Sequence, residues 1–306
     1  MLKHRRSELL LILAATMFSS NGIASKLLLD GYISPWRLAQ IRAISACLFL
    51  GIYLWRKAPH ALRLTKSEIP SMAIYGVVGI AVVQGAYFLA ITRMHVSIAL
   101  LIEFTAPVWI VLYLRFVKHR HVPHQMWVAL VLALTGLAFV AQVWEGLTLD
   151  GIGVIAAFGS AFALAFYFLM GEGIAQTRDN ISAMMWGFFF AALSWCLVLP
   201  VWSFPFEVFT TPIPLSGPFA GTSTPGWVLL SYVIFIGTII PYLFVMQGLK
   251  TLKASITSAF GMLEPILAGI IAWIWLNESW RLIQLVGGAI VIAGIYMADQ
   301  ARSKSN

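Results

Sequence analysis

The sequence predicts an all-α integral membrane protein with ten transmembrane helices, and its composition and hydropathy are the first evidence. Of the 306 residues, 60% are hydrophobic and only 10% are charged, whereas soluble domains carry about 25% charged residues. The mean hydropathy is +0.87. Most of the long apolar segments also lack the charged face that a surface helix of a soluble protein shows. Such a chain has too little polar surface to fold in water, so the soluble globular class is excluded.

The net charge of +8 does not indicate nucleic-acid binding, because the basic residues lie in short clusters between apolar segments. That distribution is typical of the preference of Lys and Arg for the cytoplasmic side of membrane proteins. With the N-terminus inside, most of the 20 Lys and Arg residues fall on the inner side. We therefore expect both termini in the cytoplasm, the lipid bilayer as a partner, and no nucleic acid.

A spanning helix needs about 20 mostly apolar residues, and ten segments of the chain meet this requirement. They are residues 8–29, 36–55, 69–90, 95–117, 125–143, 151–171, 182–200, 227–248, 254–276 and 281–298. Short breaks with turn residues or charges separate them. Residues 201–226 are the exception, because their many prolines predict a long irregular loop.

A weak internal repeat relates the two halves of the chain at a shift of 158 residues. The shift places Gly79 on Gly237, Ser97-Ile98 on Ser255-Ile256, Pro107 on Pro265 and Gly136 on Gly294. Proline and glycine each impose a backbone consequence, so these matches outweigh matches between apolar residues. The sequence predicts two five-helix repeats, residues 1–144 and 145–306. Because five is an odd number of spans, the second repeat is inverted in the membrane, as in secondary transporters that work by alternating access.

Two carboxylates lie deep within predicted spans, Glu103 and Glu264. A carboxylate in hydrocarbon is costly and therefore indicates a functional site. Each lies beside a proline: Pro107 frees the carbonyl of Glu103, and Pro265 frees that of Gly261. A freed carbonyl beside a carboxylate suits a proton or a substrate ammonium. The alternative is that each Glu is protonated and only hydrogen-bonds a neighbouring helix.

Arg42 and Asn21 lie at a depth similar to that of Glu103 and are candidate polar anchors. Three interpretations of Arg42 stay open: an ion pair with Glu103, an anchor for a substrate carboxylate, or a side chain that snorkels outward.

Further polar and aromatic residues within the spans complete the candidate site. The substrate- or proton-binding candidates are Gln84, Tyr87, Trp109, Tyr242, Gln247 and Trp273, with Ser20, Tyr113 and Tyr167 as additional polar positions. Trp109 and Trp273 could wall a cationic ligand, although Trp109 is not expected to share the helix face of Glu103. The candidate hinges are Pro107, Pro241, Gly261 and Pro265.

His119, His121 and His124 form a run that resembles a metal-ligand spacing. A solvated basic loop explains them better, because Arg115, Lys118 and Arg120 lie in the same segment. The sequence contains no nucleophile–base motif and no phosphate-binding glycine loop. We expect no metal, no cofactor and no enzymatic activity.

Two segments around the intramembrane glutamates resemble a known family of membrane proteins. The segment from Ala99 to Trp109, ALLIEFTAPVW, and the segment MLEPI from Met262, followed by Asn277-Glu278, resemble the drug/metabolite transporter superfamily, EamA-type. The resemblance covers essentially the whole chain. The EFTxP stretch is most similar to bacterial threonine/homoserine-type amino-acid exporters, which implies the bacterial inner membrane and transport driven by proton or substrate gradients. The first repeat departs from the pattern, with His119-Arg120 where the second has Asn277-Glu278.

The hypothesis from sequence is a secondary active transporter that exports amino acids or related small amine-bearing metabolites by alternating access, with proton coupling as an option. A transporter of lipophilic cations, drugs or nucleoside-like metabolites fits the same skeleton. An alternative from a different class is a membrane-embedded enzyme. It would need catalytic polar residues gathered at one membrane face, where the sequence offers only the histidine run.

Overall fold

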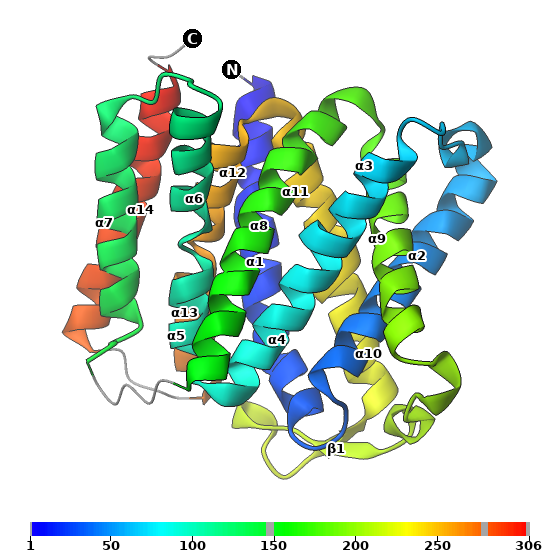
Figure 1. Cartoon of the computed structure of the whole chain (residues 1–306). Coiled ribbons are helices and arrows are strands. Elements are labelled where there is room, and N and C mark those ends of the chain that lie inside the picture. The colour runs from blue at the N-terminus through cyan, green and yellow to red at the C-terminus, as the bar shows by residue number, and fades with distance from the viewer. Residues whose placement is uncertain (1, 145–149, 277–280, 304–306) are drawn as a thin grey trace.

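The computed structural model describes residues 2–144, 150–276 and 281–303, and it is almost entirely helical (Figure 1). Within these residues nine helical stretches are long and apolar enough to cross a membrane, and a tenth, His124–Val140, is apolar but shorter. The nine are Arg5–Leu29, Pro35–Lys57, Ile69–Arg93, Ile98–Val117, Gly151–Thr177, Asn180–Val198, Gly226–Thr251, Ala254–Ile271 and Leu282–Ala301. The predicted class, an all-α membrane protein with multiple spans, is confirmed.

Six of the described stretches are single helices: α1 (Leu2–Leu29), α2 (Pro35–Lys57), α7 (His124–Val140), α8 (Gly151–Thr177), α9 (Asn180–Val198) and α14 (Leu282–Ser303). The other spans are divided into α3 (Ile69–Ile74) and α4 (Val83–Arg93), α5 (Val96–Glu103) and α6 (Ala106–Leu112), α10 (Gly226–Ile234) and α11 (Ile240–Thr251), and α12 (Ala254–Gly261) and α13 (Glu264–Leu276). Three π-helical segments belong to them: η2 (Tyr75–Val82), η3 (Tyr113–Val117) and η7 (Phe235–Ile239).

Span boundaries follow from local capping. Ser34 accepts a hydrogen bond from the backbone of Arg37 and precedes a proline at the first position of α2. Asp150 and Asp179 cap α8 and α9 in the same way. These residues satisfy backbone N–H groups that would otherwise lack partners at a helix start.

The irregular parts of the spans recur at the shift of 158 residues. The π-helical segments η2 and η7 contain Gly79 and Gly237, and the breaks between α5 and α6 and between α12 and α13 precede Pro107 and Pro265. A proline lacks the N–H that a continuous helix needs, which accounts for both breaks. The recurrence is what two repeats would produce, and the inversion of the second repeat stays a prediction.

Both chain ends lie at the same end of the bundle, called here the termini end (Figure 1). The segment between α9 and α10 lies at the opposite end, together with α5 and α13. The assignment of the termini end to the cytoplasm stays a prediction.

The prediction of a wholly irregular loop at 201–226 was wrong. Two short strands, β1 (Pro212–Pro214) and β2 (Ser223–Pro225), pair antiparallel with Ile213 opposite Thr224, and 3-10 turns flank them. Prolines fit here because the pair is only a two-stranded edge, where few N–H groups are needed. Ile213 is fully buried and Val208 nearly so, in a cluster with Leu28 and Leu230. This packing orders the segment.

Helices α7 and α14 pack through glycine. A Cβ on Gly136 would lie 2.6 Å from the carbonyl oxygen of Gly287 and 2.8 Å from the backbone nitrogen of Val291. Small residues let helix backbones approach closely in lipid, where packing rather than hydrophobic burial drives association.

We expect Gly136→Ala to destabilise the protein by about 1–3 kcal/mol, because the new methyl group meets backbone atoms that cannot move aside. Gly159→Ala is the matched control, since nothing lies within 4 Å of a Cβ built there. The control should be neutral or slightly stabilising. Thermal unfolding of both variants in detergent measures the difference, and equal midpoints would contradict the close α7–α14 contact.

Candidate substrate site

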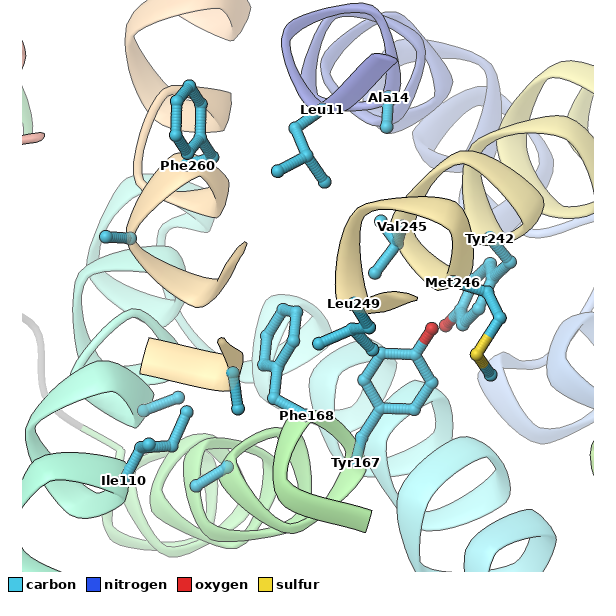
Figure 2. Packing of buried hydrophobic residues seen from close by; sticks show 14 of the residues in the cluster. Leu11, Ala14, Ile110, Tyr167, Phe168, Tyr242, Val245, Met246, Leu249 and Phe260 are labelled. Carbon is cyan, nitrogen blue, oxygen red and sulfur yellow. The ribbon is translucent and has the colours of Figure 1, made fainter. Parts of the chain in front are cut away.

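A cavity of about 120 Å³ lies in the middle of the bundle and is called here the central cavity. Its polar lining residues are Asn21, Arg42, Gln84, Tyr87, Glu103, Tyr167, Tyr242, Thr257 and Glu264. Figure 2 shows part of its apolar wall, in which Leu11, Val245, Phe168 and Phe260 come from four different helices. Gly261, one of the predicted hinges, also lines it. Most of the site residues predicted from the sequence therefore share one cavity.

Arg42 is 4% exposed and binds the π-helical segment η7. Its Nε donates to Thr238 Oγ1 at 2.7 Å, its Nη2 donates to the carbonyl of Gly237 at 2.8 Å, and the guanidinium lies 5.2 Å from the centre of the Phe88 ring. The snorkelling interpretation is therefore wrong. Among the described residues no salt bridge joins Arg42 to Glu103.

The third interpretation of Arg42, an anchor for a substrate carboxylate, is compatible with this geometry. Within the described part of the chain its Nη1 group makes no hydrogen bond, while Nε and Nη2 are held by η7. The guanidinium group is planar and rigid, so the two bonds to η7 also fix the direction in which Nη1 can donate.

Asn21 reaches the same π-helical segment from α1. A Cβ on Gly237 would lie 2.0 Å from Asn21 Oδ1, so the approach requires glycine at that position. The Asn21 amide oxygen also accepts from Ser25 at 3.2 Å. Arg42 thus bonds η7 to α2, while Asn21 packs closely against η7 from α1.

Glu103 is 7% exposed and meets Ser160 of α8, with 2.5 Å between Oε1 and the serine Oγ. The same Oγ lies 3.2 Å from the carbonyl of Val83. A hydroxyl has one proton, so it donates to one of these acceptors at a time. A protonated Glu103 would donate to the Ser160 hydroxyl, which would then donate to the carbonyl of Val83. An ionised Glu103 would instead accept the hydrogen bond from the Ser160 hydroxyl. Ser160 can therefore serve both forms of the carboxyl group.

Glu264 begins α13 directly after the helix break, and Ser19 of α1 donates to its backbone carbonyl at 2.8 Å. Glu264 lines the central cavity and also a second cavity of about 490 Å³, called here the vestibule. The vestibule includes Lys26, His95, Gln142, Pro265 and Gln284. Phe18 and Tyr87 also line both cavities, so these two residues and Glu264 separate the centre from the end of the bundle opposite the termini.

Gln84 and Tyr242 form a hydrogen bond across the central cavity, 3.3 Å from Nε2 to the phenolic oxygen. The two residues are 158 positions apart. Tyr242 also packs on Phe18, Phe188 and Tyr167 at ring-centre distances of 5.3 to 5.7 Å. The predicted repeat thus brings two corresponding positions into contact.

Thr257 and Ser160 are site residues that the sequence analysis missed. Thr257 Oγ1, like the hydroxyl of Tyr167, is buried in the cavity wall and makes no hydrogen bond of normal geometry within the described residues. The Tyr167 hydroxyl nevertheless faces those of Tyr75 and Tyr242, and Tyr75 is within reach as a side-chain hydrogen-bond partner. A buried polar group without a partner costs about 1–3 kcal/mol. The polar run Ser255 to Ser258 at the start of a span was the available signal for Thr257.

Three predicted site residues lie elsewhere or cannot be placed. Trp109 donates to Thr105 Oγ1 at 3.1 Å and packs against Phe162, with the rings tilted by 40° and their centres 4.4 Å apart, outside the central cavity. Gln247 accepts from Asn180 at 2.6 Å and joins α11 to α9 near the termini end. Neither side chain lines the central cavity, because Trp109 packs against Phe162 and Gln247 bonds Asn180. The side chain of Trp273 and residues Asn277-Glu278 lie outside the described part.

The predicted hinges Pro107 and Pro241 are buried near the first turns of α6 and α11. The histidine run is exposed, and the described residues contain no group of three or more His, Cys, Asp or Glu side chains that could hold a metal ion.

Comparison with known proteins defines the class of this protein. Residues 5–142 and 151–298 match the EamA-like transporter family. The chain therefore belongs to the EamA family of the drug/metabolite transporter superfamily and is a multi-pass membrane transporter rather than an enzyme by family.

Relatives of the chain are transporters as well. The uncharacterized inner membrane transporter YicL of Salmonella typhimurium is 20% identical over 96% of this chain and 95% of its own length. The threonine/homoserine exporter RhtA of Escherichia coli is 26% identical over 81% of this chain and 77% of its own length. A solved crystal structure covers 99% of this chain and 100% of its own with a TM-score of 0.75 and 16% identity, which supports the fold alone.

A double-mutant cycle can measure the contact between Glu103 and Ser160. We expect Ser160→Ala to destabilise the protein by about 1–3 kcal/mol, because the buried carboxyl group loses its partner. Combined with Glu103→Gln, the two effects should depart from additivity by about 0.5–3 kcal/mol. Ser194→Ala, whose hydroxyl bonds only its own helix, is the control. Additive effects would show that the two side chains are not coupled.

Proposed function

We propose that this protein is a secondary active transporter that exports small amino acids, or related amine-bearing metabolites, by alternating access. One observation carries the proposal: the central cavity is lined by Glu103, Glu264 and Arg42, and the Nη1 group of Arg42 makes no hydrogen bond within the described residues. An amino acid is a zwitterion, and it needs both kinds of partner when it leaves water. Groups of both signs in one buried cavity would satisfy it.

The size of the cavity favours a small substrate. An engineered cavity of about 150 Å³ binds benzene, and the central cavity is of similar volume, about 120 Å³. A small amino acid is of this size, whereas a nucleoside-like metabolite is much larger. In this conformation the volume argues for the amino-acid alternative and against the larger classes.

The polar groups suggest a pose for the substrate. Arg42 Nη1 would hold the carboxylate, and Glu103 or Glu264 would hold the ammonium group. The Thr257 hydroxyl, which has no hydrogen-bond partner among the described residues, would then bond a polar group on the substrate side chain. The relative named as a threonine/homoserine exporter makes hydroxylated amino acids the first candidates.

The substrate route would run from the central cavity past Phe18, Tyr87 and Glu264 into the vestibule. Residues 1–144 and 145–306 would be the two inverted repeats whose relative movement opens one side and then the other. Pro107, Pro241, Gly261 and Pro265 would act as hinges. The termini end would face the cytoplasm of a bacterial cell, with the chain in the inner membrane.

Glu103 and Glu264 would also couple transport to protons. Glu103 would exchange its proton through the Ser160 hydroxyl, and Glu264, at the boundary with the vestibule, would exchange with water on the opposite side of the membrane. A proton and a substrate ammonium would compete for the same carboxylates, which links the movement of one to the release of the other.

Proton coupling can be tested in liposomes that contain a pH-sensitive dye. Threonine, homoserine and other amino acids should each be screened for substrate-driven proton movement. We expect Glu103→Gln and Glu264→Gln to abolish this movement, because an amide does not take up a proton. Glu207→Gln, in the exposed segment between α9 and α10, is the control. Substrate exchange that persists in both variants without proton movement would show uncoupled transport with structural glutamates.

The role of Thr257 can be tested with isosteric substrates. We expect Thr257→Val to reduce threonine transport at least tenfold and to leave valine transport unchanged, because a site that hydrogen-bonds a substrate hydroxyl discriminates strongly against its absence. Thr92→Val, whose hydroxyl bonds the backbone of its own helix, is the control. An equal loss for threonine and valine would assign Thr257 a structural role.

A further inference from the structure

A second large hollow lies on the outer surface of the bundle, between the α6–η3 span and α8. It has a volume of about 900 Å³ and is called here the lateral crevice. Its wall is mostly apolar and aromatic and includes Trp109, Tyr113, Phe116, Val117, Phe162 and Phe166. Phe116 is 66% exposed and Phe162 is 51% exposed. Side chains of this kind face the hydrocarbon of a bilayer, where only an acyl chain can fill the hollow at low cost.

The end of the crevice nearest the termini carries positive charge. Lys118 and Arg120 line it, and both side chains are exposed. The chain reverses here through His119, which has a φ of 50°, and the reversal is held by hydrogen bonds from Lys118 N to Tyr113 O at 3.0 Å and from Arg120 N to Leu114 O at 2.9 Å. The Lys118 ammonium lies 5.9 Å from the centre of the Tyr113 ring. The turn therefore keeps both cations at the mouth of the apolar crevice.

Arg120 also lines a smaller hollow of about 90 Å³ with His121, Lys253 and Ser255. Lys253 is the residue before α12, where the helix dipole is positive. The only carboxylate among the residues of the lateral crevice is Glu172, and its Oε2 accepts from the backbone nitrogen of Ala254 at 2.7 Å. An anion beside Arg120 would thus have Lys118 in the lateral crevice and Lys253 in the smaller hollow as further basic neighbours. The Glu172 carboxylate already accepts a hydrogen bond from Ala254.

We propose that the lateral crevice binds one anionic phospholipid, with its phosphate between Lys118, Arg120 and Lys253 and an acyl chain along Trp109 and Phe162. Basic pockets between membrane helices, at the level of the headgroups, bind anionic lipid in this way. The site is separate from the central cavity and does not depend on what the protein transports. It also gives a role to Trp109, to the π-helical segment η3 and to the basic turn, which the substrate site leaves unused.

The lipid would contact the part of the fold that carries Glu103. Trp109 lies on α6, directly after the break that separates it from α5. Phe162 lies on α8, little more than half a helical turn from Ser160, the partner of Glu103. A bound acyl chain would therefore support both helices at the site where the backbone of this span is interrupted.

Native mass spectrometry of the full chain can test this site. The protein is purified in mild detergent and exposed to matched amounts of phosphatidylglycerol and phosphatidylcholine with the same acyl chains. We expect one copy of phosphatidylglycerol to be retained at least tenfold more tightly than phosphatidylcholine. A basic residue near an anionic headgroup contributes about 1 kcal/mol, or roughly fivefold in affinity. The double variant Lys118→Gln/Arg120→Gln should therefore lose most of this preference, about 25-fold, and keep at most the roughly fivefold contribution of Lys253.

The control is Arg56→Gln/Lys57→Gln, which removes two basic residues from the last turn of α2. It should retain the lipid as the natural sequence does, and both double variants alter only exposed side chains. Equal retention of the two lipids, an equal loss in the control, or displacement of the lipid by millimolar inorganic phosphate would each overturn the proposal. In a second measurement, brominated acyl chains should quench less tryptophan fluorescence in Trp109→Phe; unchanged quenching would place the lipid elsewhere.

Discussion

The absence of water in a bilayer is the constraint on which the rest of this structure depends. Every backbone N–H and C=O in the hydrocarbon must find a partner within the protein, so regular helices are the default and irregular backbone survives only beside a cavity or under cover of other helices. Here the interruptions follow that rule. Glu103 and Gly261, at the ends of α5 and α12, both line the central cavity, and Arg42, another residue of that cavity, donates to a backbone carbonyl of η7. The central cavity thus lies where the helices of the bundle are interrupted.

The guanidinium group of Arg42 and the carboxyl group of Glu103 share one cavity without forming an ion pair among the described residues. A direct pair between Arg42 and Glu103 would satisfy both groups and leave nothing for a ligand. Instead η7 holds Arg42 and Ser160 holds Glu103. Each charge is supported by the protein but keeps hydrogen-bonding capacity for something else. Under the proposed function, stability would be given up for binding at this site, and the Thr257 hydroxyl, without a partner among the described residues, fits that view.

The spans, the two helix breaks and most of the polar cavity residues could be predicted, because hydropathy, proline and intramembrane charge are local signals. What could not be predicted depends on partners distant in the chain. Arg42 bonds Gly237, 195 residues away. Glu103 bonds Ser160, a small residue that lies between Gly159 and Ala161 and gives no signal of a polar site in the sequence. Trp109 and Gln247 were misplaced for the same reason, since sequence depth does not tell which side of a helix faces the centre. The order in residues 201–226 arises from the burial of Ile213, which many nearby prolines obscured.

The hydrogen bond between Gln84 and Tyr242 has a consequence for the cargo. Corresponding positions of two related halves touch only near the axis that relates them, so under the proposed repeat the cavity straddles a pseudo-twofold axis. The carboxylates do not obey this symmetry: the position that corresponds to Glu103 is Gly261, and the one that corresponds to Glu264 is Ala106. Under the proposed repeat, a duplicated scaffold would thus have acquired two chemically different walls. A substrate bound between them would have one preferred orientation, and in the proposed transport cycle it would present the same end to the vestibule each time.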